Sequence, residues 1–407
     1  MADPPIGRVL RAEASSQRAT FLELFLDLVF VFALTRVSQR LVADFTTDQR
    51  IVFPEASKTL LLFLALWLVW ASTAWVTSAV EPEAFAVQGF VVITMVGSMV
   101  LAVALPQGFG ERALIFAVAY LAIQLGRMGF FLSATRTWTS RGDRSSPRRV
   151  FLWAALTAVP WIVGGLAGEN VLRAVLWSVA LTVDYLGFTL RWPAPRLGRL
   201  SYGSQSSAFG GEHLAERYQQ FLLIALGEVI LVTGFTFTAG GDSFTLGRTS
   251  GLGMALLTTV LLWRIYFYRA GHVLPLAIIG ARNPIRLGLS TAYTHLIMIA
   301  GIVLTGVGYE LTIKHPFDNV VAGWLIPILG GPALFLAGRA GFEFQVFGRV
   351  SRPRVAGLFM LGAVVPATGR LPLLAVAAAA AAVLLGVALF DLRRARGQAL
   401  EEPAPPV

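Results

Sequence analysis

The chain has 407 residues, of which 56% are hydrophobic and 14% are charged, and its mean hydropathy is +0.69. A soluble domain has roughly 25% charged residues, so this composition predicts a polytopic membrane protein. The absence of cysteine excludes disulfides, thiolate metal sites and cysteine nucleophiles. The formal net charge of +10 is explained by the loop residues described below, and it does not indicate a nucleic-acid partner.

The segment 1–19 is polar and carries Arg8, Arg11 and Arg18. It lacks an apolar stretch ending in a small-residue cleavage site, so we expect the first span to serve as an uncleaved insertion signal. Apolar runs that match the length of a bilayer crossing, about 20 residues, then predict an all-α bundle of about twelve membrane-spanning helices. The expected spans are 20–43, 56–79, 84–105, 111–133, 149–168, 171–191, 212–238, 246–268, 286–311, 319–339, 352–368 and 371–391.

Lys and Arg are concentrated in alternate loops, and the positive-inside rule then places both termini in the cytoplasm. The Pro-, Gly- and Ser-rich segment 192–211 predicts a cytoplasmic linker. It separates two six-helix halves, 20–191 and 212–391, between the tails 1–19 and 392–407. Because each half opens with an acid-bearing span, the pattern favours a six-plus-six parallel repeat, an arrangement found in some transporters.

Polar residues inside the spans are the most informative feature of the chain. A charge at the centre of a bilayer costs about 2.5–3.5 kcal/mol on insertion scales, so such residues pair with one another or line a polar path. We expect most of them in the inner halves of their spans, in a polar cavity or charge network that opens to the cytoplasm. The expected path residues are Glu23, Asp27, Tyr120, Gln124, Arg127, Asp184, His213, Glu216, Arg217, Glu228 and His295.

Some of these acids have a structural alternative. Glu23, His213 and Glu216 also fit the headgroup boundary, where a charge costs little. Asp27 and Glu228 lie deeper, and neither has an oppositely charged residue within one turn of its own helix. The pattern therefore favours a functional role for these two carboxyl groups.

The basic residues also have structural alternatives. Arg127 and Arg217 fit ion pairs between helices better than substrate contacts, and His295 fits either a helix–helix hydrogen bond or a proton carrier. Arg36 and Glu310 fall on the outer side, at a gate or at the interface. The sequence contains no phosphate-binding loop, zinc signature or nucleophile elbow. We therefore expect no enzymatic activity, metal or cofactor.

Two stretches form distinctive signatures, ATFLELFLDLVFVFAL at Ala19–Leu34 and EHLAERYQQFLLIALGEVI at Glu212–Ile230. They resemble the signatures of the low temperature requirement protein A (LtrA) family of bacterial membrane proteins. Further matches are Pro106, Phe109-Gly110, Tyr120, Gln124, Arg127, His295, Gly301 and Gly308-Tyr309-Glu310. The resemblance covers nearly the whole chain and implies a multi-pass protein of the bacterial inner membrane, in contact with the lipid bilayer.

The chain departs from that family at two places. Relatives often carry an acidic cluster after the second span, where this chain has VEPEAF with Glu81 and Glu83. They often have an Asp in the aromatic motif of the eighth span, where Tyr268 stands. If those acids serve ion binding in relatives, this member differs from them.

The sequence favours three functions over a fourth, an intramembrane enzyme, for which His213 near Glu216 is the one catalytic-looking pair and fits a helix-end salt bridge equally well. It predicts no oligomeric state. The leading hypothesis is a secondary transporter of an unidentified small solute or ion, with proton coupling through Asp27 or Glu228 as one form of it. The second is a cation channel with two six-helix repeats. It rests on Phe25-Leu26-Asp27, which resembles the Phe-Ser-Asp motif of two-repeat potassium channels, although the seventh span has Leu226-Gly227-Glu228 instead. The third is a membrane sensor or cold-adaptation factor without transport, implied only by the growth phenotype in the family's name.

Overall fold

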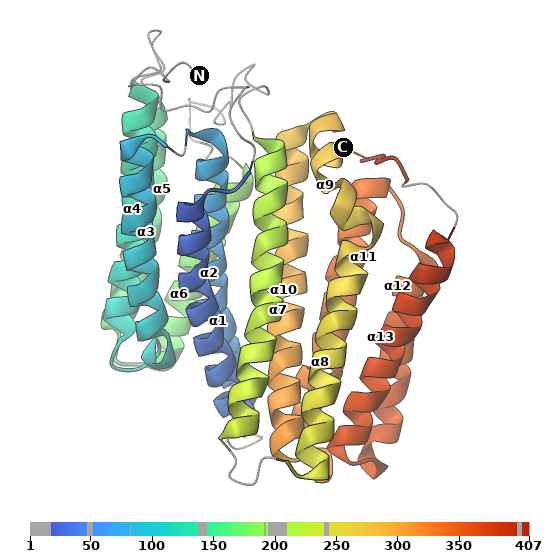
Figure 1. Cartoon of the computed structure of the whole chain (residues 1–407). Coiled ribbons are helices and arrows are strands. Elements are labelled where there is room, and N and C mark those ends of the chain that lie inside the picture. The colour runs from blue at the N-terminus through green and yellow to red at the C-terminus, as the bar shows by residue number, and fades with distance from the viewer. Residues whose placement is uncertain are drawn as a thin grey trace. The chain divides into compact units, whose positions relative to one another are not determined.

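The computed structural model describes residues 18–46, 52–81, 83–136, 145–190, 193, 210–239, 244–396 and 401–406. These residues form thirteen α-helices and no β-strand (Figure 1). The helices are α1 (Phe21–Thr46), α2 (Val52–Ala79), α3 (Phe85–Ala104), α4 (Ala113–Arg136), α5 (Ser145–Leu166), α6 (Asn170–Leu190), α7 (Gly211–Thr238), α8 (Leu246–Tyr266), α9 (His272–Gly280), α10 (Pro284–Lys314), α11 (Gly331–Phe347), α12 (Arg352–Val364) and α13 (Leu373–Ala395). The predicted class, an all-helical polytopic membrane protein, is confirmed.

Within the described ranges, eight helical segments are long and apolar enough to cross a membrane. They are Phe53–Ala79, Phe85–Gln107, Ala113–Phe130, Asn170–Leu190, Gly211–Thr238, Pro284–Lys314, Ala322–Phe347 and Leu373–Arg394. Helices α1, α5, α8 and α12 correspond to the other four expected spans. The count of about twelve crossings stays a prediction.

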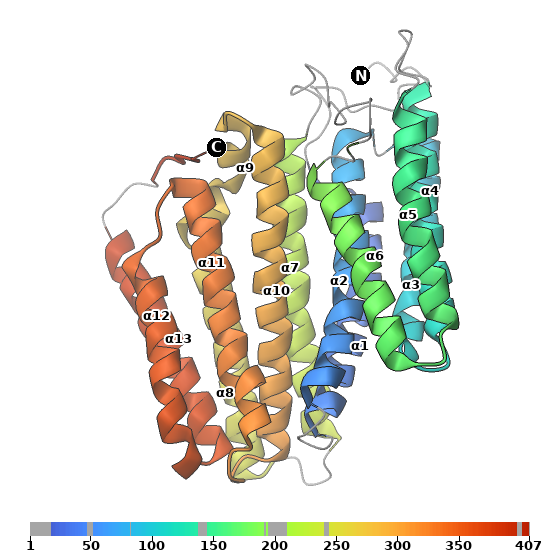
Figure 2. The same ribbon diagram turned by 180° about the vertical axis from the view of Figure 1, so that it is seen from behind.

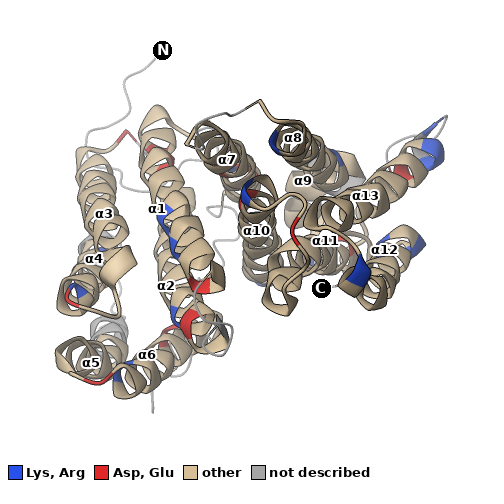
Figure 3. Ribbon diagram, turned by 90° about the horizontal axis from the view of Figure 1, so that it is seen from below, with Lys and Arg blue, Asp and Glu red and all other residues tan. Residues whose placement is uncertain are grey.

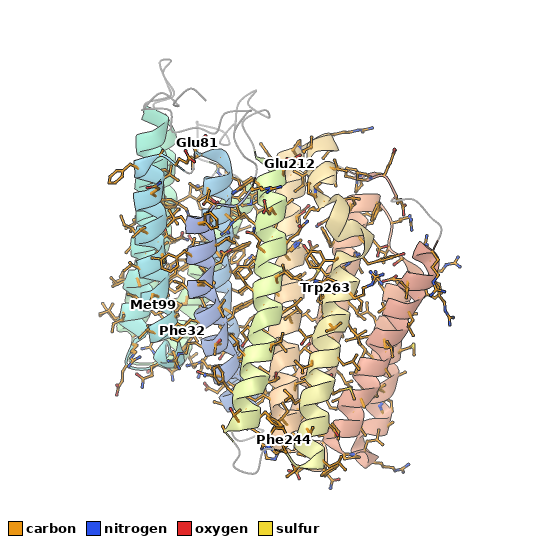
Figure 4. The ribbon with its side chains drawn as sticks, in the orientation of Figure 1. Phe32, Glu81, Met99, Glu212, Phe244 and Trp263 are labelled. Atoms are coloured by element: carbon orange, nitrogen blue, oxygen red, sulfur yellow. The ribbon has the colours of Figure 1, made fainter. Side chains whose placement is uncertain are left out.

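Large apolar side chains are exposed along the helices of both units, including Met99 of α3 and Trp263 of α8 (Figure 4). Charged residues occupy few positions along the ribbons of the helices (Figure 3). A soluble protein rarely exposes contiguous apolar surface on this scale. The outer faces therefore suit contact with hydrocarbon.

The chain forms two compact units, which we call unit 1 and unit 2. Unit 1 comprises Met1–Val37 and Pro54–Leu214, and unit 2 comprises Ser38–Phe53 and Ala215–Val407. Helices α1, α2 and α7 thus contribute residues to both units. Nearly all of the predicted linker, 192–211, lies outside the described residues. The predicted halves and their parallel repeat stay predictions.

The core of unit 1 is a stack of aromatic rings between α4, α5 and α6. The ring centroids of Tyr120 and Trp161 are 4.4 Å apart, and those of Trp161 and Trp177 are 5.0 Å apart. The Trp177 indole donates a hydrogen bond to the Trp161 carbonyl at 3.1 Å. Gly164 makes room for it, because a Cβ there would lie 2.6 Å from Trp177 Nε1. These rings pack α5 against α4, which carries Tyr120 and Gln124, and against α6, which carries Asp184.

In unit 2, α10 and α11 approach each other closely along their length (Figure 2). A Cβ on Gly301 would lie 2.4 Å from the Phe335 nitrogen, and one on Gly331 would lie 2.6 Å from the Thr305 nitrogen. Glycine at such positions lets two backbones meet, which is a common way to pack membrane helices. This close packing holds α10 in place and so fixes the positions of its polar residues, His295 and Glu310.

Two expected boundaries in unit 2 differ from the observed helices. The expected span 319–339 begins close to the apolar segment Ala322–Phe347 but ends before it, because π-helical and 3-10 turns at 322–330 precede α11, which continues to Phe347. Pro327 and Pro332 lie at this junction and remove backbone donors from regular α-helix. The eighth span was expected to end at 268, whereas α8 ends at Tyr266 and a π-helical turn, Phe267–Gly271, leads into the short helix α9.

Candidate functional site

Glu23 is held at the first turn of α1 by a capping box. The Thr20 nitrogen and its Oγ1 are each 3.0 Å from Glu23 Oε2, and the Glu23 nitrogen donates to Thr20 Oγ1 at 3.3 Å. This reciprocal pattern satisfies backbone donors that a helix start leaves free. Glu23 Oε2 also lies 3.0 Å from Nε2 of His213, which is at the start of α7. Both side chains are buried inside the protein, at 2% and 0% exposure.

The second ring nitrogen of His213 contacts Ser78 of α2. The distance from Nδ1 to Ser78 Oγ is 2.9 Å, and that hydroxyl is 2.7 Å from the Ala74 carbonyl. A carbonyl only accepts, so when the single hydroxyl hydrogen of Ser78 goes to Ala74, Nδ1 of His213 must carry a proton and donate. Nε2 and the Glu23 carboxylate then share one further proton between them. The geometry is that of a buried acid–imidazole pair able to hold and release a proton.

Asp27 lies one turn beyond Glu23 on α1. Trp70 of α2 donates from Nε1 to Asp27 Oδ1 at 3.0 Å, and both side chains are fully buried. An indole donates a hydrogen bond but brings no charge. Trp70 thus orients the Asp27 carboxyl group without itself neutralising it.

Three predicted residues meet in a network between α4 and α6. Tyr120 donates its hydroxyl to Asp184 Oδ2 at 2.8 Å, and Gln124 Nε2 donates to the Tyr120 oxygen at 2.8 Å. Arg127 donates to Ser72 of α2 and lies within electrostatic range of Asp184. The predicted path residues of α4 therefore contact two different helices, α6 through Tyr120 and α2 through Arg127, and Arg127 is placed where it could serve as an internal counter-ion.

His295 lies in unit 2 with a different proton arrangement. Its Nδ1 is 2.9 Å from the Thr291 carbonyl, which requires a proton on Nδ1, and the Tyr266 hydroxyl is 2.8 Å from Nε2. The ring accepts from Tyr266 in this arrangement and is neutral. It also stacks on Tyr218 at 4.9 Å between centroids. This geometry matches the helix–helix hydrogen bond considered for His295.

Near the start of α7, Glu216, Arg217 and Gln220 form local contacts. Gln220 Nε2 donates to Glu216 Oε1 at 3.1 Å, and Arg217 Nη1 is 3.4 Å from Gln220 Oε1. Arg217 is buried and Glu216 is partly exposed. The contacts fix the direction of both charged side chains on one face of the helix.

Glu228 is fully buried in the middle of α7. Neither of its carboxyl oxygens has a hydrogen-bond partner within the part of the chain that the structure describes. The Ser38 hydroxyl lies beside it without a well-directed hydrogen bond, and Glu310 of α10 is close enough to act on its charge. Glu228 differs in this respect from Glu23, whose Oε2 lies 3.0 Å from two donors of Thr20 and from the His213 ring.

A buried four-charge cluster in unit 2 was missed at the sequence level. Arg354 Nη1 is 2.6 Å from Asp391 Oδ2, and Arg354 Nε and Arg339 Nη1 are 3.6 and 3.8 Å from Glu343 Oε2. Ser351 also donates to Glu343 at 2.9 Å. The four charges balance and tie α11, α12 and α13 together. They were not predicted because the expected spans 319–339, 352–368 and 371–391 leave all four residues at or beyond span ends, where a charge is ordinarily interfacial, whereas α11 in fact continues to Phe347. The i, i+4 spacing of Arg339 and Glu343 was the available signal.

Among the residues that the structure places, no three or more His, Asp or Glu side chains form a group suited to a metal ion. In unit 1 the polar residues form hydrogen-bonded networks. In unit 2 they form the hydrogen bond between Tyr266 and His295 and the four-charge cluster of α11, α12 and α13, and the Glu228 carboxyl group lies apart from both.

Comparison with known proteins gives the family. The model of the bacterial low temperature requirement A protein (LtrA) matches residues 18–389. An uncharacterized protein of Rhizobium meliloti (strain 1021) is 39% identical over 342 residues, covering 81% of this chain and 78% of that protein. No solved structure matches. The predicted resemblance is confirmed, and the chain belongs to the LtrA family of bacterial polytopic membrane proteins.

Proposed function

We propose that this LtrA-family protein is a secondary transporter that couples the movement of a small solute or ion to a proton. The observation that carries the proposal is the buried Glu23–His213 pair, with Nε2 and Oε2 3.0 Å apart and the other ring nitrogen on Ser78. Ionisable groups inside membrane segments commonly form proton relays in transporters. In this proposal the protein catalyses no reaction and needs no cofactor.

The pair is suited to coupling because its two members neutralise each other while the site is closed. A buried lone charge is costly, whereas a paired and hydrogen-bonded charge is tolerated. When Glu23 and His213 separate, the shared proton stays on one of them, and each group can then exchange a proton with the side of the membrane to which the site opens. A conformational change that opens the pair is thereby linked to proton movement.

Asp27 is the second proton-binding group in the proposal. It follows Glu23 by one turn on the same helix and receives a neutral donor from Trp70. Arg127 and Arg217 would hold an anionic part of the solute or act as internal counter-ions. The protein would lie in the bacterial inner membrane with both termini in the cytoplasm, as the distribution of Lys and Arg favours.

The test is proton flux in proteoliposomes under an imposed pH gradient, read with a lumenal pH dye. Wild type is compared with Asp27→Asn and with His213→Gln. The matched control is His315→Gln, because His315 is an exposed histidine paired with Asp318 near the end of α10. We expect each test variant to lose most of the flux at normal expression and the control to keep it.

The proposal fails if the test variants carry the wild-type flux. Resolved current steps in planar bilayers would also reject it, because a transporter turns over too slowly to produce them, and the cation channel would then be favoured. An absence of proton movement in the wild-type protein would exclude proton coupling. A membrane factor without transport, or a channel for another cation, would then account better for the buried charges.

A further inference from the structure

The carboxyl group of Glu228 is buried in a way that the proton-coupling proposal does not use. It has 0% exposure, and both oxygens lack a hydrogen-bond donor within the described ranges. An ionised carboxylate in such a place is costly unless something positive neutralises it. The surroundings of Glu228 should therefore indicate what it binds.

Ser38 supplies the first neighbouring oxygen. Buried hydroxyls in the helices of this protein generally donate to a carbonyl of the preceding turn, as Thr305 donates to Gly301 at 2.7 Å and Thr312 to Gly308 at 2.8 Å. Ser38 is fully buried, yet among the described residues its hydroxyl makes no such bond. It lies beside Glu228 instead. A hydroxyl released from its own helix can offer lone pairs to a ligand.

Glu310 of α10 supplies the second carboxyl group. Its Oε1 accepts from Lys314 Nζ at 2.8 Å, and its Oε2 is buried without a partner in the described part of the chain. Lys314 ends α10 and is 40% exposed in its side chain. The two carboxylates and one ammonium leave a net charge of minus one around Glu228.

We infer that Glu228, Ser38 and Glu310 form a binding site for an alkali-metal cation. Four buried atoms without donors, Glu228 Oε1 and Oε2, Ser38 Oγ and Glu310 Oε2, are all oxygen, which is the ligand type of hard cations. One monovalent cation cancels the remaining charge, whereas a divalent cation would exceed it. A proton would neutralise one carboxyl group but leave the other oxygens without a partner.

The charged surroundings of the site support this choice. Ser38 comes from α1, Glu228 from α7 and Glu310 from α10, and all three belong to unit 2. Glu310 acts on the charge of Glu228, so this neighbour adds negative charge to the site, and the ammonium of Lys314 lies against the other oxygen of Glu310. Lys314 is the most exposed residue beside this site, and its positive charge would oppose the entry of a cation from that side.

The inference goes beyond the proposed function, because the site would bind its cation whether or not the protein moves a proton. It is tested by binding with the purified full-length protein in detergent. Thermal unfolding is followed in NaCl, LiCl, KCl or MgCl₂ against choline chloride at constant ionic strength, and ²²Na⁺ binding is measured directly. Variants are Glu228→Gln, Ser38→Ala and Glu310→Gln. The matched control is Ser98→Ala, since Ser98 is also fully buried and without a hydrogen-bond partner in the described structure.

We expect the unfolding temperature to rise with the concentration of at least one alkali cation, because a ligand that binds only the folded state stabilises it. Glu228→Gln should abolish the rise, and Ser38→Ala and Glu310→Gln should each weaken the apparent affinity by roughly 10-fold or more. Ser98→Ala should respond as wild type. If Glu228→Gln does not fold, Ser38→Ala carries the test, because it removes a hydroxyl and no charge. Equal responses to all salts, stabilisation by Mg²⁺ alone, or a wild-type response in Ser38→Ala and Glu310→Gln would overturn the inference.

Discussion

Replacing Gly301 by alanine tests whether α10 and α11 depend on direct backbone contact. A Cβ at this position would lie 2.4 Å from the Phe335 nitrogen, 2.8 Å from the Gly331 oxygen and 2.9 Å from the Phe335 Cα. Ordinary Cβ contacts begin at 3.4 Å, so the helices must separate by about 1 Å. All three atoms belong to the backbone, and no rotamer change can relieve the clash. Overpacking of this kind costs roughly 1–3 kcal/mol.

The assay is reversible unfolding in mixed micelles, with Gly253→Ala as the matched control. Gly253 lies in α8, where an added Cβ would meet nothing within 4 Å. Alanine is a better helix former than glycine by about 0.5–1 kcal/mol, so the control should be neutral or slightly stabilised. We expect Gly301→Ala to lower the free energy of unfolding by about 1–3 kcal/mol. Equal stability of the two variants would refute the view that this pair needs its glycines.

Two further predictions concern buried partners. Arg354→Met leaves Asp391 without its ion pair at 2.6 Å, and we expect the free energy of unfolding to fall by roughly 3–5 kcal/mol; adding Asp391→Leu should recover much of the loss, and a failure of that rescue in the same unfolding assay would contradict the pairing. Trp70→Phe removes the hydrogen bond to Asp27, worth about 1.5–3 kcal/mol if the carboxyl group is charged. We expect a shifted pH dependence of proton flux with little change in expression, and an unchanged profile would exclude Trp70 from orienting Asp27.

Much of the helical framework could be predicted because continuous apolar runs define it. The expected spans 84–105 and 171–191 differ by at most a residue at each end from α3 and α6. The failures occur where apolar composition and helical geometry separate. Pro327 and Pro332 lie in an apolar run, but they shift the regular helix α11 toward the C-terminus. Hydrophobicity alone does not predict where the regular helix begins within such a run.

The site was predictable as a set of residues and not as a set of partners. Periodicity gives the face of a helix on which Glu23 or His213 lies, but these residues are separated by 190 positions. Which helices pack together depends on tertiary structure that one sequence does not encode locally. The partner of Asp27 escaped for a different reason. Trp70 is neutral, so a search for opposite charge could not find it.

Glu23 and Glu228 show why residue type alone does not determine the chemistry of these sites. Both are buried acids in signature stretches, yet Glu23 Oε2 lies within 3.0 Å of two Thr20 donors and of His213. A metal cation there would displace donors that already satisfy the oxygen. Glu228 is beside Ser38 and Glu310, whose free oxygens would gain from a cation. The two acids should therefore differ in what neutralises them: a shared proton at Glu23, and an alkali cation at Glu228.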